Sequence, residues 1–167
     1  MSTTSLLWHY TIGQNYRLIL ADKAIKPSPA YSGTKDGAVV WFSRNQVWDS
    51  STIKGVDEPD GTWRKLTTEE LEKVGGGLYR IGVAREAAPH DWDDFVHLSG
   101  IARFIAADLR RTAKDRGASH KDWFVSFDPV PQAQWLAAEV WENHQWISVE
   151  KSQANQVVRS FDVGWRA

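Results

Sequence analysis

The sequence predicts an α+β fold with mixed, mostly antiparallel sheets and one main helix. Apolar runs of strand length recur along the chain, at residues 5–11, 38–43, 78–84, 123–127, 134–141 and 145–149. A longer stretch after Ser99 places apolar residues at helical spacing. The predicted order, β-α-β-(α)-β-α-β-β-β, does not alternate as a doubly wound fold does. A length of 167 residues fits one domain, and no linker or repeat divides residues 1–167.

The composition excludes several classes of site. The chain has 20 basic and 21 acidic residues and a net charge of −1, so its bulk charge does not imply nucleic-acid binding. It has no cysteine, which excludes disulfides, thiolate metal sites and cysteine nucleophiles. The first residues lack a signal-peptide pattern, and no apolar run approaches the roughly 18 residues of a membrane span. We therefore expect a cytoplasmic protein with no membrane contact.

Local signals place the helices. Two threonines, each followed three residues later by Gln or Glu, have capping-box spacing: Thr11 with Gln14 and Thr67 with Glu70. They predict helices over about 12–21 and 68–74, the second stopped by three glycines. Ser99 is expected to cap the main helix, whose apolar stripe comprises Ile101, Phe104, Ile105 and Leu109. Its last turns are basic, with Arg110, Arg111, Lys114 and Arg116, which suits a solvated helix end better than an anion site.

The remaining segments divide into loops and late strands. Proline and glycine predict loops over residues 27–37 and 53–63. Residues 85–97 are expected to be irregular and acidic, and 157–163 to form a final short strand.

Ten tryptophans make the chain tryptophan-rich. Large aromatic side chains are used first of all as core, and we expect most of these tryptophans to be buried. The alternatives are a cleft lined with flat rings for a nucleotide or sugar, and a protein-binding surface.

Familiar catalytic motifs are absent from the sequence. It contains no GxxxxGK[ST] phosphate loop, no GxGxxG after a strand and no GxSxG elbow. The histidines never pair at a zinc-ligand spacing, so no metal site is predicted. His90 with Asp91, Asp93 and Asp94 has the donor types for a cation, but a solvated acidic loop is the preferred interpretation.

Three segments carry a resemblance to a known family. They are residues 9–11 (HYT) at a strand end, 19–27 (ILADKAIKP) at a helix exit, and 39–43 (VVWFS) on the next strand. Together they look like the front half of the ADP-ribosyltransferase superfamily, over about residues 7–45. The resemblance implies a cleft between sheets that binds NAD as a substrate. Tyr10 stands where the family pattern usually has glycine.

The resemblance also implies roles for individual residues. His9 would hydrogen-bond the ribose next to nicotinamide, the Tyr10 backbone would grip the carboxamide, and Thr11 would lie close by. Trp41 or Phe42 would stack on the nicotinamide ring, supported by Ser43. Arg44 and Arg80 are candidates to hold the pyrophosphate, although a surface arginine is the preferred description of each.

The family further needs a late carboxylate. Its task is to stabilise the oxocarbenium-like sugar that forms when nicotinamide departs. Glu139 is the best candidate, because an ionisable group among small and apolar strand residues is costly without a purpose or a partner. The alternatives are a paired structural role for Glu139, or use of Glu142 or Glu150 instead. With His9, Glu139 would form the catalytic pair.

The leading hypothesis is therefore an enzyme that transfers ADP-ribose from NAD to an unknown acceptor, such as a protein or a nucleic acid. A second hypothesis is a nucleotide-binding module that uses the same aromatic cleft without chemistry. A third is a small bacterial or phage inhibitor protein that binds a partner through its tryptophans.

Overall fold

The computed structural model describes residues 5–29, 37–52 and 54–150. The helices are α1 (Gly13–Asp22), α2 (Thr68–Gly75), α3 (Trp92–Leu98) and α4 (Arg103–Asp115). The strands are β1 (Leu7–Ile12), β2 (Ala24–Ile25), β3 (Val40–Ser43), β4 (Gly55–Asp57), β5 (Trp63–Lys65), β6 (Leu78–Val83), β7 (His90–Asp91), β8 (Trp123–Ser126), β9 (Val130–Pro131), β10 (Trp135–Glu142) and β11 (Gln145–Ser148). The paired strands are antiparallel, so the predicted α+β class with antiparallel sheets is confirmed.

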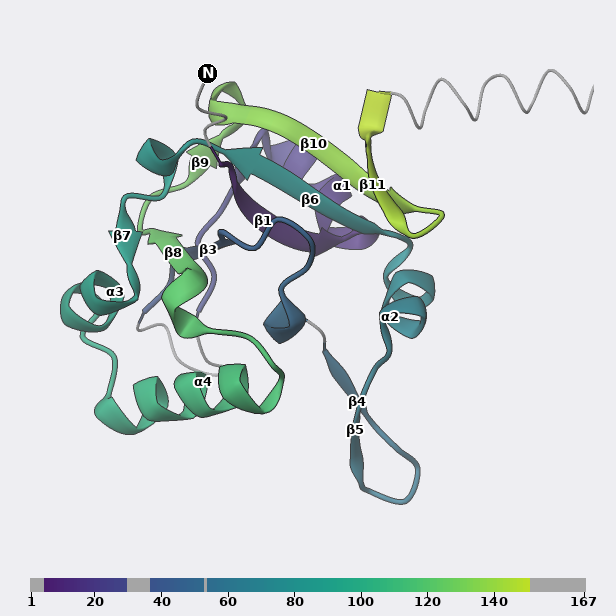
Figure 1. The fold of residues 1–167 in the computed structure, drawn as a ribbon, viewed down its shortest axis with the longest axis horizontal. Coiled ribbons are helices and arrows are strands. Elements are labelled where there is room, and N and C mark those ends of the chain that lie inside the picture. The colour runs from purple at the N-terminus through teal and green to yellow at the C-terminus, as the bar shows by residue number, and fades with distance from the viewer. Residues whose placement is uncertain (1–4, 30–36, 53, 151–167) are drawn as a thin grey trace, which may run out of the picture.

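Seven strands form the main sheet, in the order β11-β10-β6-β1-β3-β8-β7. Two further pairs, β2–β9 and β4–β5, make small sheets of their own. Figure 1 shows the main sheet in the upper half of the view, α4 below it, and the β4–β5 hairpin projecting away from the body. Within the described residues no helix has both the length and the apolar character that crossing a membrane requires.

The core lies on both faces of the main sheet. On one face, Leu7, Phe42 and Ile81 pack against Tyr16 of α1. On the other face, a second cluster joins β3 and β8 to α3 and α4, and a third surrounds α2. Of the nine tryptophans in the described ranges, Trp8, Trp92 and Trp123 are buried, five are half-buried, and only Trp63 is largely exposed.

Because neighbouring strand residues point to opposite faces, β1 divides its side chains between the two. Leu7, His9 and Thr11 lie on the face that carries α1, and Trp8 and Tyr10 lie on the opposite face. We call these the α1 face and the far face of the sheet.

The main sheet splits between β1 and β3. The two strands share one register pair, Trp8 with Ser43. Beyond it, β1 continues to Ile12 paired with β6, whereas β3 runs back to Val40 paired with β8. This leaves one edge of β1 without a strand partner in the described residues, beside residues 40–42 of β3.

The first predicted helix cap is wrong and the second is confirmed. Thr11 belongs to β1, and the N-cap of α1 is Ile12, which makes no side-chain capping bond. A backbone contact replaces the cap, since the Gly13 N–H donates to the Gly77 carbonyl at 2.9 Å. In α2 the capping box between Thr67 and Glu70 is present in both directions.

The loop predicted over residues 53–63 is wrong at residues 55–57 and 63, which belong to β4 and β5, whereas residues 58–62 form the turn between the two strands. β4 and β5 pair as a hairpin there. Asp60 accepts a hydrogen bond from the Thr62 N–H at 2.9 Å, and Gly61 adopts a φ of 80°. These are turn-forming features that favour a hairpin. The later hairpin, β10–β11, follows its prediction, with its turn at Asn143 and His144.

The stretch predicted to be irregular, 85–97, contains β7 and α3. Asp91 is the N-cap of α3, accepting hydrogen bonds from the N–H groups of Asp93 and Asp94 at 3.0 Å each. The acidic cluster is therefore a helix N-terminus, where carboxylates face the positive end of the dipole. No group of three or more His, Asp or Glu converges as a metal site within the described residues.

This assignment predicts unequal effects for two neighbouring aspartates. Asp91→Ala is expected to lower the free energy of unfolding by about 1 kcal/mol, because it removes the cap from two N–H groups. Asp93→Asn, which removes one charge but no cap, is expected to cost about 0.3 kcal/mol. Urea denaturation of both variants measures the difference, and the reverse ranking would contradict the cap.

The main helix begins later than predicted. α4 starts at Arg103 after Ala102, and Ser99 instead ends α3 and accepts a hydrogen bond from the Ile101 N–H at 3.2 Å. Phe104 is 70% exposed and does not belong to the apolar stripe. The strand predicted over 157–163 and most of the loop over 27–37 lie outside the described residues.

Candidate functional site

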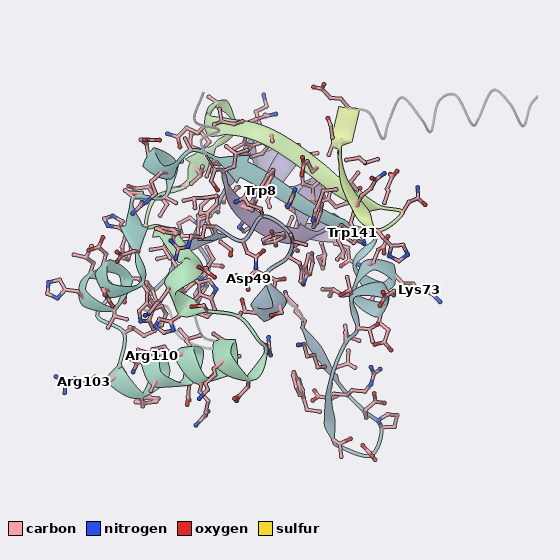
Figure 2. The ribbon with its side chains drawn as sticks, viewed as in Figure 1. Trp8, Asp49, Lys73, Arg103, Arg110 and Trp141 are labelled. Atoms are coloured by element: carbon pink, nitrogen blue, oxygen red, sulfur yellow. The ribbon has the colours of Figure 1, made fainter. Side chains whose placement is uncertain are left out.

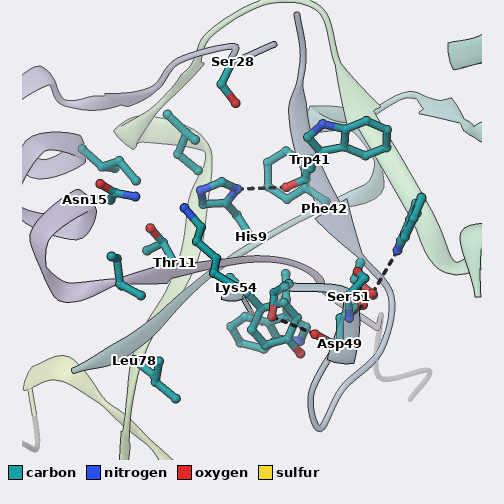
Figure 3. A pocket seen from close by; sticks show the side chains of 18 of the residues that line it. His9, Thr11, Asn15, Ser28, Trp41, Phe42, Asp49, Ser51, Lys54 and Leu78 are labelled. Atoms are coloured by element: carbon teal, nitrogen blue, oxygen red, sulfur yellow. Dashed lines mark hydrogen bonds between the residues drawn. The ribbon is translucent and has the colours of Figure 1, made fainter. Parts of the chain in front are cut away.

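A cleft of about 780 Å³ opens where β1 and β3 separate. Its walls come from β1, α1, β3, the segment before β4, and α4. Figure 3 shows His9, Thr11 and Asn15 on one side of it, and Asp49, Ser51 and Lys54 on another. The volume is in the range of small-molecule and cofactor sites, which are mostly apolar with a few placed polar groups.

His9 lies at the point where the strands separate. Its Nδ1 is 2.9 Å from the Trp41 carbonyl oxygen, and its ring contacts the Phe42 edge at a centroid distance of 5.8 Å (Figure 3). The imidazole thus joins β1 to β3 where the backbone ladder between them has ended. Because a carbonyl only accepts, Nδ1 must carry the hydrogen in this bond.

Burial lowers the pKa of His9 below its usual value, although the bond to Trp41 opposes the shift. The neutral imidazole with its hydrogen on Nδ1 leaves an unprotonated Nε2. This atom makes no hydrogen bond to the described part of the chain. His9 therefore presents a fixed hydrogen-bond acceptor at the cleft.

The charged groups of the cleft are few. Lys26 and Asp22 pair with each other at 2.9 Å and are both exposed. Asp49 is buried, and its carboxylate accepts from the Trp123 indole at 3.1 Å and from the Ser51 N–H at 3.0 Å. Lys54 makes no ion pair within the described ranges, and in Figure 3 its chain extends toward His9. A cation is thus available to an anionic ligand.

The aromatic residues predicted from β3 line the cleft in a different way from that expected. The Phe42 ring is on the α1 face with His9, and only 2% of this residue is exposed. The Trp41 ring is on the far face, in edge contact with Phe95 at 4.8 Å and Trp123 at 5.6 Å. Ser43 is buried and accepts from the Asn45 N–H. These rings are held by the core.

Tyr10 and Arg44 are engaged elsewhere. The Tyr10 side chain is on the far face, where its hydroxyl donates to the Asn45 carbonyl at 2.7 Å and its ring contacts Trp48 and Trp146. Tyr10 is among the residues that line the cleft, and the role expected for its backbone stays a prediction. Arg44 pairs with Asp122 at 2.7 Å and does not line the cleft.

Glu139 does not lie next to His9 in the structure. It lies opposite Arg80 across β10–β6, whereas His9 lies opposite Ile81, the next residue of β6. Neighbouring strand residues face opposite ways, so Glu139 is on the far face and His9 on the α1 face. Glu139 bonds the Arg80 guanidinium at 2.7 Å (to Nε) and 2.5 Å (to Nη2). The paired structural role is the correct alternative for Glu139.

Arg80 is the centre of this second cluster, on the far face. It is buried, with its guanidinium carbon 3.8 Å from the Trp8 ring centroid and 4.5 Å from that of Trp146. It also donates to the Gln46 carbonyl at 2.7 Å. Arg80 is therefore not a surface arginine, and it does not line the cleft. The other late acids, Glu142 and Glu150, do not line the cleft either.

Sequence reasoning missed several residues that line the cleft, among them Asn15, Asp49 and Lys54. Asn15 comes from the first turn of α1, and Asp49 and Lys54 flank the short helix between β3 and β4. Asp49 carries a detectable signal, since it is followed at once by two serines and a threonine, a pattern typical of aspartate-centred turns.

Comparison with family models, curated proteins and solved structures finds no match to this chain.

Proposed function

We propose that the cleft between β1 and β3 binds NAD or a related nucleotide, in the manner that the resemblance to the ADP-ribosyltransferase superfamily implies. The observation that carries the proposal is the fixed tautomer of His9, whose free Nε2 is an acceptor beside Thr11 and Asn15. A ribose supplies hydroxyl donors for such an acceptor.

Two further features of the cleft support a nucleotide. The unpaired edge of β1 offers backbone N–H and C=O groups, which match the donor and acceptor of a carboxamide. Lys54 offers an ammonium group to a phosphate. The indole Nε1 of Trp48, another residue of the cleft wall, is buried without a partner in the described part of the chain. An unpaired buried donor is costly unless a ligand supplies an acceptor.

Titration calorimetry with NAD tests this proposal. We expect saturable binding and a raised Tm, and we expect Lys54→Ala to weaken binding. Lys73→Ala, at an exposed lysine of α2 away from the cleft, is the matched control and should bind as wild type does. An NAD titration that produces no heat of binding, together with an unchanged Tm, would contradict the proposal.

ADP-ribose transfer is the second candidate function, and it is favoured by the buried carboxylate of Asp49. With Glu139 on the far face, Asp49 is the cleft acid that is not paired with a lysine. A carboxylate held in this way would stabilise a positively charged sugar.

Release of nicotinamide from NAD separates binding from transfer. If the protein is a transferase, Asp49→Asn is expected to lower the rate by about 100-fold, the typical cost of removing one electrostatic group. Glu139→Gln should lower the rate of nicotinamide release only in proportion to the fraction of the variant that is unfolded, which circular dichroism measures. Equal rates for Asp49→Asn and wild type would contradict the assignment of Asp49.

A further inference from the structure

α4 gathers a stripe of positive charge that the bulk composition conceals. Arg103, Arg110 and Lys114 are spaced by seven and four residues, which places them on one side of α4, along about 16 Å of its length. All three are exposed, and none makes an ion pair within the described residues. We call this set the basic stripe.

The helix dipole does not account for the whole stripe. Basic residues near a helix C-terminus are favoured by the dipole, which explains Lys114. Arg103, however, is the first residue of α4, where the dipole disfavours a positive charge. The acids of α4 do not neutralise the stripe, because Asp108 pairs with Arg111 at 2.7 Å. Asp115 forms no ion pair with the stripe in the described part of the chain.

The stripe continues into the segment after α4. Arg110 and Lys114 line a shallow hollow with Arg111, Ala118, Ser119 and His120. Burial lowers the pKa of His120, and the positive charges of Arg110 and Lys121 lower it further, against the opposing effect of Asp93. Arg110, Lys114 and Lys121 thus place three cations near this end of the stripe.

An exposed aromatic ring adjoins the stripe. Phe104 follows Arg103 directly and is 70% exposed, more than any other large apolar residue in the described ranges. A line of cations beside a free aromatic ring is the combination that binds single-stranded nucleic acid, through phosphate contacts and base stacking. A membrane surface would need a broad apolar face, and the exposed large apolar residues of α4 are limited to Phe104.

We propose that α4 binds single-stranded nucleic acid, with Arg103, Arg110 and Lys114 on phosphates of the strand and Phe104 against a base. The opposite side of the same helix, at Leu109, Thr112 and Arg116, lines the cleft. A strand bound to α4 is therefore held beside the cleft. The surface is independent of what the cleft binds.

Fluorescence anisotropy with a labelled oligothymidylate tests the stripe. The triple variant Arg103→Gln/Arg110→Gln/Lys114→Gln should bind at least about tenfold more weakly at low salt. Its slope of log K against log salt should be smaller by about 2, since each lost phosphate contact removes about 0.7 for a single strand. The control, Arg17→Gln/Lys23→Gln/Lys73→Gln, removes the same charge at exposed positions and should leave affinity nearly unchanged. Figure 2 shows Lys73 on the opposite side of the molecule from Arg103 and Arg110.

Phe104→Ala tests the stacking. It should weaken oligothymidylate binding by about tenfold and leave unchanged the binding of an abasic phosphodiester oligomer of equal length. Three results would overturn the proposal: no binding by wild type, equal losses in the stripe and control triples, or tighter binding to anionic vesicles than to the oligonucleotide. Circular dichroism of each variant checks that the loss is not unfolding.

Discussion

Glu139→Ala is expected to lower the free energy of unfolding by about 3 kcal/mol, although the residue is one of the best catalytic candidates by sequence. The substitution leaves the Arg80 guanidinium buried between Trp8 and Trp146 without its carboxylate. Breaking a buried pair on one side typically costs 3–5 kcal/mol, and the partial exposure of Glu139, 24% of its side chain, places the cost at the lower end. Urea denaturation measures this loss in the free energy of unfolding.

A double variant distinguishes the loss of the Arg80–Glu139 ion pair from the cost of leaving Arg80 buried without a partner. Arg80→Met/Glu139→Leu replaces both charges by apolar groups of similar size and is expected to recover part of the loss, because no unpaired charge remains. Glu86→Gln is the matched control, at an exposed glutamate of the turn after β6, and should change stability by less than about 0.5 kcal/mol. A Glu139→Ala variant as stable as wild type would contradict the structural role of Glu139.

The difference between the expected and observed role of Glu139 comes from register. The residue types on β10 indicate an ionisable group at a costly position, which is correct. They do not indicate the face, because a shift of one residue in the pairing with β6 would turn Glu139 toward the opposite side of the sheet. Its partner, Arg80, is 59 residues away in sequence, and no local pattern links the two.

Features that depend on near neighbours were predictable. Thr67 and Glu70 are three residues apart, and their capping box forms as the spacing indicates. The strands β3, β6, β8, β10 and β11 follow their apolar runs. Thr11 has the same local pattern as Thr67, yet the backbone of Gly77 takes its place at the start of α1. That contact joins positions far apart in the chain and has no local signal.

The cleft was predictable in part, for the same reason. His9, Thr11 and Phe42 stand on strands that local patterns identify, and all three line the cleft. The placement of Asp49 and Lys54 depends on the route of the chain between β3 and β4. Arg110 and Lys114 were visible in the sequence as a basic helix end, but Arg103 joins them only because α4 begins at that residue, which places it on the same side of the helix.

His9 is expected to make both ligand binding and stability depend on pH. His9→Ala should weaken NAD binding by about tenfold, equivalent to about 1.4 kcal/mol, because the acceptor Nε2 is lost. Protonation of wild-type His9 should have a similar effect, since Nε2 then becomes a donor, but burial moves this protonation to a pH below the usual pKa of histidine. Calorimetry at about pH 7.5 measures the effect of His9→Ala, and a series that continues below about pH 5.5 measures the effect of protonation. His97→Ala, at an exposed histidine of α3, should bind as wild type does.

The sign of the stability effect follows from the direction of the pKa shift. Burial lowers the pKa of folded His9, so below about pH 6.5 the unfolded chain takes up a proton that the folded protein does not. The contribution of His9 to the free energy of unfolding is complete above the unfolded pKa and is lost as pH falls toward and through the folded pKa.

His9→Gln stays neutral, so its free energy of unfolding should fall less than that of wild type between about pH 7.5 and about pH 5.5. His120, whose pKa is also lowered, is common to both proteins and cancels in the comparison. Parallel pH profiles for the two proteins would show that His9 is not held neutral between β1 and β3.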